Sequence, residues 1–321
     1  MNMKAIYLLV LPLLMSPAIL SCGGDDDEPA PAPVEKPTPA PEPGGNNNSE
    51  PQMTVMSFNI RCITGADVDE HAWDARRAPC ISMFRDVKPD IAGLQEVRPA
   101  QHDYLVSELG DTYGSFCASD NGVTSVTSVA TMIIYLKSRF ELVEKGHFWL
   151  STTPDVESAP GWGATDTEVR TAVWVRLHDK KYDKDIYMCD AHLPYKAADN
   201  DARSGCTQLI VNRMKDKAGN DMPVIVTGDM NASWNPDDAR RPSIKNLYDW
   251  MSGARQTADV VNPDVYSLNR YGETSKVTEN DNIDHIFYRN VQPFEFKVID
   301  SPNYGVKYIS DHYPVILTLA Y

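Results

Sequence analysis

The chain has 321 residues, of which 42% are hydrophobic and 23% are charged, and its formal net charge is −15. This length and apolar content suffice for one large domain, and they exclude a collagen, a coiled coil, a multi-pass membrane protein and a disulfide-dense mini-domain. The acidity also argues against a partner held by broad attraction to a phosphate backbone, which needs clustered Lys and Arg.

The first 22 residues have the pattern of an export signal. Lys4 precedes an apolar run over 5–14, and a small residue stands directly before Cys22. A charged start followed by a short apolar core is typical of a signal peptide rather than of a membrane span. Residues 19–22 resemble a bacterial lipobox, in which Cys22 would become the lipidated first residue of the mature protein. The alternative is a soluble secreted protein with an ordinary cleavage site.

Residues 23–51 are predicted to form a disordered acidic and Pro-rich tether. The acidic run 25–28 resembles the signal that carries lipoproteins of Bacteroidetes-type bacteria to the cell surface. The rest of the segment lacks large apolar side chains, so it cannot bury enough surface to offset the entropy of ordering, and its alternating prolines favour an extended backbone. We therefore predict an exported outer-membrane lipoprotein, exposed at the cell surface and held to the membrane only by its lipid anchor.

Residues 52–321 are predicted to form one folded domain, and we expect a monomer. This part of the chain carries a net charge of −10, because residues 1–22 contribute +1 and residues 23–51 contribute −6. Its five Cys show no CxxC pair, which argues against a thiolate zinc site, and an odd number leaves at least one thiol free.

The predicted elements of this domain alternate between strand and helix at first and then become rich in strands. Helices are predicted over 73–87, after Pro99 and over 197–217, where apolar residues recur at helical spacing or Pro suits the first turn. The strands, rich in β-branched and aromatic residues, are predicted over 54–60, 90–96, 129–136, 140–150, 171–177, 185–193, 223–228, 283–288, 294–299 and 314–319.

Polar residues gather where six of these strands end or begin. One such residue would be read as part of a turn, but six together indicate a site, since the ends of packed strands meet at one rim. These residues are Asn59, Glu96, Asp190 with His192, Asp229 with Asn231, Asp284 with His285, and Asp311 with His312.

This set of side chains fits metal-assisted hydrolysis. Carboxylate and amide oxygens are the ligands of hard cations such as Mg²⁺, which usually binds one or two protein carboxylates together with a substrate phosphate. An imidazole held by a carboxylate can take a proton from water or stabilise a phosphoryl oxygen. A metal, a polarised water and one or two His together describe the hydrolysis of a phosphate ester.

Six motifs around these residues resemble, in order and spacing, the endonuclease/exonuclease/phosphatase superfamily of metal-dependent phosphoesterases, in an uncharacterised bacterial branch. The resemblance runs over 53–321 and implies an α/β (α+β) fold, a two-sheet β-sandwich flanked by helices in the four-layer DNase-like arrangement, with the site at one rim. The motifs are Met56–Arg61, Pro89–Val97, Asp190–Leu193, Thr227–Asn231, Ile283–Phe287 and Ser310–Val315.

The resemblance also implies roles for individual residues. Asn59, Glu96 and Asp311 would hold the metal, Mg²⁺ or Mn²⁺. The catalytic residues would be His192, Asp229, Asn231, Asp284 and His312, with His312 paired to Asp284 and either Asp229 or His312 acting as the general base. Asp190 departs from the Asn that many members have, which leaves its side chain without an implied role.

Arg61 and Arg170 are candidates for binding the substrate phosphate, and a structurally paired Arg is the equal alternative. The substrate stays open between a phosphorylated small molecule, a nucleotide, a nucleic acid and a phospholipid headgroup. The alternative to an enzyme is a catalytically inactive surface lipoprotein that binds a phosphorylated or glycan ligand.

Overall fold

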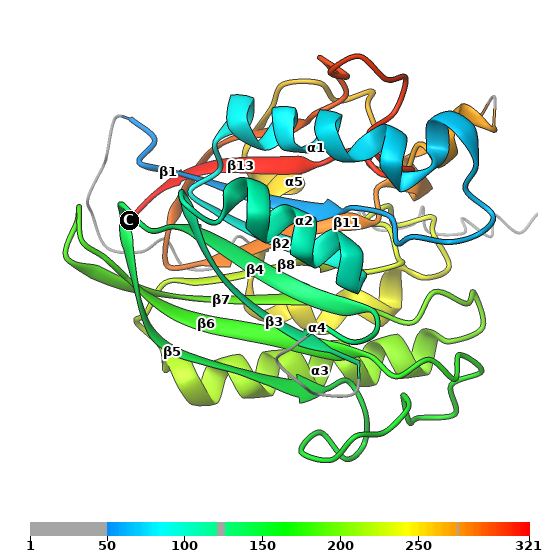
Figure 1. The fold of residues 1–321 in the computed structure, drawn as a ribbon. Coiled ribbons are helices and arrows are strands. Elements are labelled where there is room, and N and C mark those ends of the chain that lie inside the picture. The colour runs from blue at the N-terminus through cyan, green and yellow to red at the C-terminus, as the bar shows by residue number, and fades with distance from the viewer. Residues whose placement is uncertain (1–49, 121–125, 275) are drawn as a thin grey trace, which may run out of the picture. The chain divides into compact units, whose positions relative to one another are not determined.

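Two β-sheets packed face to face form the centre of the fold in this computed structural model (Figure 1). Residues 50–120, 126–274 and 276–321 are described; the predicted signal peptide, Cys22 and the predicted tether up to residue 49 lie outside them. The first sheet has the order β10 (Asp259–Val260), β12 (Gln292–Val298), β13 (Val315–Ala320), β1 (Met53–Asn59), β2 (Ile91–Val97), β4 (Ala130–Leu136), β3 (Tyr113–Ser119). The second has the order β5 (Phe140–Trp149), β6 (Thr171–Asp179), β7 (Lys184–His192), β8 (Val224–Asp229), β11 (Asp284–Arg289), β9 (Ser252–Gly253).

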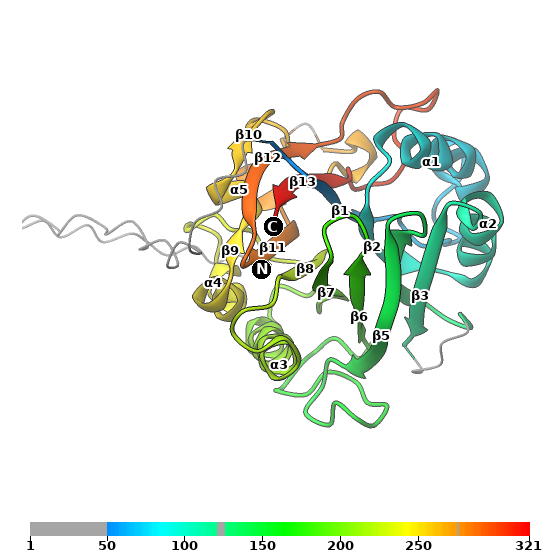
Figure 2. The same cartoon turned by 90° about the vertical axis from the view of Figure 1, so that its left-hand side faces the viewer.

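Helices cover the outer face of each sheet (Figure 2). The first sheet carries α1 (Trp73–Val87) and α2 (Pro99–Leu109), and the second carries α3 (Asn200–Ala218) and α4 (Lys245–Trp250). Three apolar cores follow from this layering, one between the sheets and one under each pair of helices. The predicted four-layer α/β sandwich is confirmed. Smaller elements are α5 (Ala254–Thr257) and the 3-10 helices η1 (Asp69–His71), η2 (Arg241–Ile244), η3 (Arg270–Gly272) and η4 (Glu279–Asp281).

The helix α3 shows how local sequence produces this packing. Cys206, Ile210 and Met214 recur every four residues, lie on one face and are fully buried against the second sheet. Polar residues occupy the opposite face, so the helix buries a single stripe, as an amphipathic helix does. None of the helices within the described ranges has the length and apolar content required to cross a membrane.

Strand pairing brings the predicted polar strand ends to one edge of the sandwich. In the first sheet β1 and β2 are parallel, with Asn59 opposite Gln95. In the second sheet β7 and β8 are parallel, with His192 opposite Asp229, and the antiparallel β11 places Asp284 opposite Asp229. The carboxyl ends of four strands and the start of a fifth therefore lie together.

The two sheets approach closely below this edge because β2 carries Gly93. A Cβ atom at this position would lie 2.1 Å from Thr227 Oγ1 and 2.2 Å from the Asp190 carboxylate of the facing sheet. Without that Cβ, the Gln95 amide reaches across and donates to Asp190 Oδ1 at 2.7 Å. The glycine thus permits a polar link between the sheets beneath the site.

The predicted helices and strands correspond to observed elements, with ends displaced by a few residues at most, and the helix over 73–87 matches α1 at both ends. The strand β3 was not predicted, because its sequence mixes Gly, Ser and Ala with apolar residues and shows no strand pattern. All its residues pair with β4, so tertiary pairing makes this segment a strand. Cys62, Cys80, Cys189 and Cys206 are free thiols.

Candidate active site

A cleft of about 680 Å³ opens at the edge where the strand ends meet. This volume is typical of a pocket for a small molecule. Asn59 and Asp284 lie behind the cleft wall and contact residues that line it. The charged and imidazole side chains of the lining are Arg61, Glu96, Arg98, Asp120, Glu157, Glu168, Arg170, His192, Asp229, Asp311 and His312.

The backbone is strained at three positions of this edge. The backbone φ angles of Arg61, Glu96 and Asn231 are 58°, 65° and 49°. These values lie in the left-handed region, which residues other than Gly adopt rarely. Each stands at or just beyond a strand end, where the chain turns away from its sheet. Such conformations cost of order 1–3 kcal/mol each and persist where the surrounding structure requires them, as at functional sites.

Glu96 is held as a carboxylate by two hydrogen bonds. The Asn59 amide donates to Oε1 at 3.1 Å, and the Cys62 N–H donates to Oε2 at 2.9 Å. Burial opposes ionisation, but these donors and the neighbouring His192 outweigh it and lower the pKa of Glu96 to about 2. The same Asn59 amide also donates to Asp229 Oδ2 at 3.1 Å and so joins the two acids.

Asp229 lies at the centre of the cluster. Its Oδ1 accepts the Asn231 N–H at 2.9 Å, while Nε2 of His192 lies 3.5 Å from its Oδ2. Burial and the nearby Asp284 carboxylate raise the pKa of Asp229 to about 7. Burial lowers the pKa of His192 to about 3, so this imidazole is neutral. The Asp229 carboxyl can therefore exchange a proton near neutral pH.

His312 and Asp284 form a buried pair. The His312 Nδ1 lies 2.8 Å from Asp284 Oδ2, a distance that assigns a donating N–H to this nitrogen. Nε2 of the same ring lies 3.9 Å from Asp229 Oδ2. Burial would lower the pKa of His312, but the Asp284 carboxylate more than offsets it and raises the pKa to about 10. The imidazole is therefore a cation held in a fixed orientation.

The donors of the site fit a hard divalent cation. Side-chain oxygen or nitrogen atoms of Asp229, Asp284 and His312 lie within 4.8 Å of one another. Because His312 is protonated and paired to Asp284, Asp229 is the member of this group that can face a cation. Oxygen donors are the ligands that Mg²⁺ and Mn²⁺ prefer, and the ionised Glu96 supplies the charge. The partly buried Asp311 carboxyl lines the same cleft, and burial raises its pKa, a cost that a nearby cation would offset. Glu96, Asp229 and Asp311 thus offer three carboxyl groups around one space.

The two arginines of the site differ in what their guanidinium groups contact. Arg61 binds both carboxylate oxygens of Asp67 at 2.9 Å, and its NH1 lies 3.5 Å from Asp311. Arg61 is therefore occupied by protein acids and positions Asp311. Arg170 is 7% exposed, and its NH2 is paired to Asp166 at 3.1 Å and Glu168 at 3.0 Å. Its buried Nε has no hydrogen-bond partner among the residues that the structure describes.

Asp199 fixes the loop that presents Arg170. One oxygen of its carboxylate accepts the N–H and the hydroxyl of Thr165 at 2.8 Å each, and the other accepts the Asp166 N–H at 2.9 Å. The ion pair between Asp166 and Arg170 begins directly after this anchor. The position of Arg170 at the cleft is thereby set by α3, whose first turn follows Asp199.

Two polar residues of the strand ends point away from the cleft. Asp190 is buried between the sheets and accepts hydrogen bonds from Gln95 and Thr227. His285 lies on the opposite face of β11 from Asp284, and its Nε2 lies 2.8 Å from the Ala232 carbonyl oxygen, so that nitrogen donates. Sequence alternation along a strand predicts this outward direction for His285.

Five further charged or aromatic residues line the cleft without having been singled out by sequence. They are Arg98, Asp120, Glu157, Glu168 and Tyr195. Only Tyr195 carried a usable signal, since it follows the His192 motif at the end of β7. The others lie in turns and loops, where charged residues are ordinary. Cys62 also lines the cleft; burial raises the pKa of its thiol to about 12, so it is not a thiolate.

Comparison with known proteins bears on the fold and the family. The profile of the Endonuclease/Exonuclease/phosphatase family matches residues 56–312. The solved structure of the mannosyl-6-phosphatase Bt3783 from Bacteroides thetaiotaomicron VPI-5482 superposes with a TM-score of 0.74 and 25% identity, over 84% of this chain and 100% of that one. An endonuclease/exonuclease/phosphatase family protein from Bacteroides thetaiotaomicron superposes with a TM-score of 0.74 and 25% identity, over 85% and 99% of the two chains.

A viral protein also aligns in sequence. The uncharacterized protein L388 of Acanthamoeba polyphaga mimivirus is 27% identical over 281 residues, which cover 83% of this chain and 99% of the viral one. In each of these three comparisons the similarity extends over nearly the whole of the other chain.

Proposed function

The chain belongs to the endonuclease/exonuclease/phosphatase family, and from this premise we propose that it is a divalent-metal-dependent hydrolase of phosphate esters. One observation carries the proposal. Glu96, Asp229 and His312, which come from three distant parts of the chain, line one cleft in three different ionisation states. A site that only binds a ligand does not require an anion, a group titrating near neutrality and an oriented cation side by side.

Each of these groups has a role in the proposed reaction. Glu96, with Asn59 and Asp311, would hold Mg²⁺ or Mn²⁺, which when bound supplies electrophilic stabilisation of the phosphoryl oxygens. Asp229 orients the attacking water and takes its proton, because its pKa of about 7 suits a base at neutral pH. His312, protonated and fixed by Asp284, donates a hydrogen bond to a phosphoryl oxygen.

Three other side chains would position the phosphate. The Asn231 side chain donates to the Leu193 carbonyl at 2.9 Å, which fixes the amide beside Asp229. The neutral His192 lines the cleft on the other side of that acid. Arg170 lines the cleft, and its planar, charged guanidinium would donate hydrogen bonds to the phosphate oxygens.

A phosphomonoester of a small molecule is the substrate that we propose. Residues 52–321 carry a charge of −10, and the cleft itself is lined by six carboxyl groups against three guanidinium groups. This balance opposes a polynucleotide, which needs an extended basic surface. The mannosyl-6-phosphatase among the structural relatives supports a monoester. A nuclease is the second candidate, because the family includes endonucleases and exonucleases.

Turnover measurements test the activity. We expect phosphate release from p-nitrophenyl phosphate with Mg²⁺ or Mn²⁺, its loss in EDTA, and a loss of at least about 100-fold in Glu96→Gln, since that variant removes the charge that holds the cation. Glu70→Gln serves as the matched control, because Glu70 is exposed and lies outside the cleft. Faster turnover of bis-p-nitrophenyl phosphate would favour the nuclease-type candidate.

The alternative of an inactive surface protein makes a different prediction. A pure binder would retain affinity for a phosphorylated or glycan ligand while showing no turnover of any phosphoester with Mg²⁺ or Mn²⁺. Turnover that does not depend on Glu96 would count against the site assigned above. Calorimetric titration with inorganic phosphate, performed on the wild type and on Glu96→Gln, separates binding from catalysis.

We also propose that the domain is displayed on the outer membrane through a lipid on Cys22. The support is the sequence alone, namely the apolar run over 5–14, the lipobox-like residues 19–22 and the acidic run 25–28. Cells grown with labelled palmitate should label the wild type and Cys62→Ala but not Cys22→Ala. Protease added to intact cells should remove the domain if it faces outward.

A further inference from the structure

The cleft extends beyond the cluster around Asp229 into a second region, which we call the outer subsite and define by Asp120, Glu157, Glu168 and Tyr195. All four line the same cleft as the proposed catalytic residues. The charges that most affect the Asp120 carboxyl are those of Arg170, Glu168 and Arg98, whereas those that most affect Asp229 are Asp284 and His312. The outer subsite therefore has acids of its own and shares Arg170 with the catalytic cluster, since Arg170 also lowers the pKa of His192.

Arg170 stands between the two regions. Its NH2 is held by Asp166 and Glu168, while its Nε is buried and has no hydrogen-bond partner within the ranges that the structure describes. The guanidinium also lies 6.0 Å from the centre of the Tyr195 ring. A buried cation with an unused donor at the wall of a cleft points to a ligand oxygen that completes its contacts.

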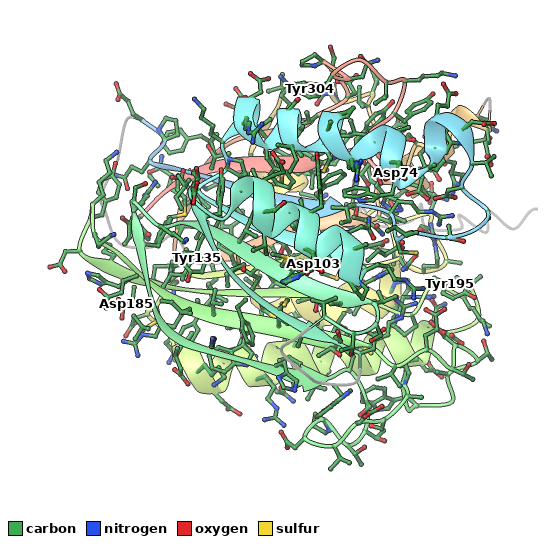
Figure 3. The ribbon with its side chains drawn as sticks, viewed as in Figure 1. Asp74, Asp103, Tyr135, Asp185, Tyr195 and Tyr304 are labelled. Atoms are coloured by element: carbon green, nitrogen blue, oxygen red, sulfur yellow. The ribbon has the colours of Figure 1, made fainter. Side chains whose placement is uncertain are left out.

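Tyr195 presents an open aromatic face at this point. The residue is 52% exposed although it lines the cleft, and it lies at the end of the sandwich opposite Asp185, as Figure 3 shows. Tyrosine combines an apolar ring with a polar hydroxyl, so it can cover the C–H face of a ring that is itself polar at its rim.

The acids of the outer subsite select among leaving groups. Carboxylates accept hydrogen bonds from paired hydroxyl groups, and burial raises the pKa of Asp120 to about 7, so this carboxyl can both donate and accept near neutral pH. A second phosphate placed here would meet Glu157 and Glu168 and be repelled. An uncharged group with many hydroxyls would satisfy the acids and also stack on the aromatic ring.

We propose that the outer subsite binds an uncharged polyhydroxylated leaving group, so that the preferred substrate is a sugar phosphate monoester. This inference rests on the proposed function. In the reaction the oxygen of water bonds to phosphorus, the phosphorus–oxygen bond to the sugar breaks, and the proton lost by water balances the one gained by the sugar oxygen. The products are the free sugar and inorganic phosphate.

The test compares two substrates in the full chain with Mg²⁺. The first is a hexose 6-phosphate; the second is acetyl phosphate, which has neither hydroxyl groups nor a ring. We expect Asp120→Asn and Tyr195→Ala to lower kcat/KM for the hexose phosphate by about tenfold or more, as expected for a lost charged hydrogen bond or a lost stacking contact. The same variants should change kcat/KM for acetyl phosphate by less than about twofold.

Matched controls separate the subsite from general effects. Tyr195→Phe keeps the ring and should retain most of the activity toward the hexose phosphate. Asp103→Asn removes a carboxylate that is 81% exposed and lies on α2, outside the cleft (Figure 3). This variant should leave kcat/KM unchanged for both substrates.

Three results would overturn the inference. The first is an equal loss for both substrates in Asp120→Asn and Tyr195→Ala. The second is a wild-type preference for a 5′-mononucleotide or a short oligonucleotide over hexose phosphates. The third is the absence of Glu96-dependent turnover of every phosphoester, which would also end the proposed function; the first two results leave that function standing.

Discussion

The pair formed by His312 and Asp284 yields the sharpest prediction about the chemistry. Asp284→Asn keeps the shape of the side chain and removes the charge that the imidazole faces at 2.8 Å. In the wild type that charge outweighs burial and places the pKa of His312 near 10 rather than 6.5. In the variant the smaller contributions of Asp311 and Asp229 remain, but burial is the largest influence on this imidazole and lowers its pKa. We therefore expect His312 to become neutral at pH 7.5.

Two free energies indicate how strongly Asp284 stabilises the His312 cation. A pKa of about 10 against 6.5 corresponds to about 5 kcal/mol in favour of the cation at 1.36 kcal/mol per pKa unit. Breaking a buried ion pair costs about 3–5 kcal/mol, which is the same order. Loss of one charged donor to the phosphoryl group should lower kcat by about 100-fold to 1,000-fold.

The protonation state of His312 decides in which direction activity changes with pH. The active form carries a proton on His312, so activity persists below the pKa of that group and falls as pH rises through it. The alkaline limb of kcat/KM should therefore lie near pH 9–10 in the wild type, following the pKa of about 10, and below pH 7 in Asp284→Asn. Proton and carbon NMR of the His312 ring titrates the same group directly.

Asp185→Asn is the matched control for this experiment. Asp185 also contacts a histidine, with His178 Nδ1 at 2.9 Å from its carboxylate, but the pair lies outside the cleft, and Figure 3 shows Asp185 at the end opposite Tyr195. This variant should keep the wild-type pH profile. An Asp284→Asn enzyme with wild-type kcat and an unmoved alkaline limb would refute the role assigned to the His312 cation.

Three further predictions concern positioning and stability. Asp166→Asn removes one anchor of Arg170 and should raise KM for a phosphomonoester about tenfold with kcat within about twofold; an unchanged KM would contradict the positioning role. Burial lowers the pKa of His285 from 6.5 to about 4, so stability present above pH 6.5 is lost as the pH falls toward 4. Urea unfolding should show about 3 kcal/mol more loss in the wild type than in His285→Asn between pH 7 and 4, and equal losses would argue against a buried neutral imidazole. Gly93→Ala places a Cβ 2.1 Å from Thr227 Oγ1 and should cost about 1–3 kcal/mol, measured as a lower Tm; an unaltered Tm would show that the sheets can separate there.

Much of the architecture was accessible from local sequence patterns. The helix α1 was predicted with both its ends, because its apolar spacing is regular and Pro89 follows it closely. The polar strand ends were visible because each follows or precedes a run of apolar residues. Their meeting at one edge required the pairing of parallel strands, which β1 with β2 and β7 with β8 provide.

The hydrogen-bond and ion-pair partners of individual side chains could not be predicted from the sequence. Arg61 and Arg170 look alike in sequence, yet Arg61 is paired to Asp67 and Asp311. Arg170 also lines the cleft, but its Nε has no hydrogen-bond partner within the described part of the chain. The difference depends on loops that fold back over several residues, and no periodic pattern encodes it. Asp120 was missed for the same reason.

The amino-acid sequence by itself determined which residue types stand at the strand ends and hence the family, because motifs and apolar runs are local properties of the chain. Only the tertiary structure decided the charge that each group carries. Glu96, Asp229 and His312 depart from their ordinary ionisation in different directions, and these departures depend on burial and on separations of a few ångströms between distant segments.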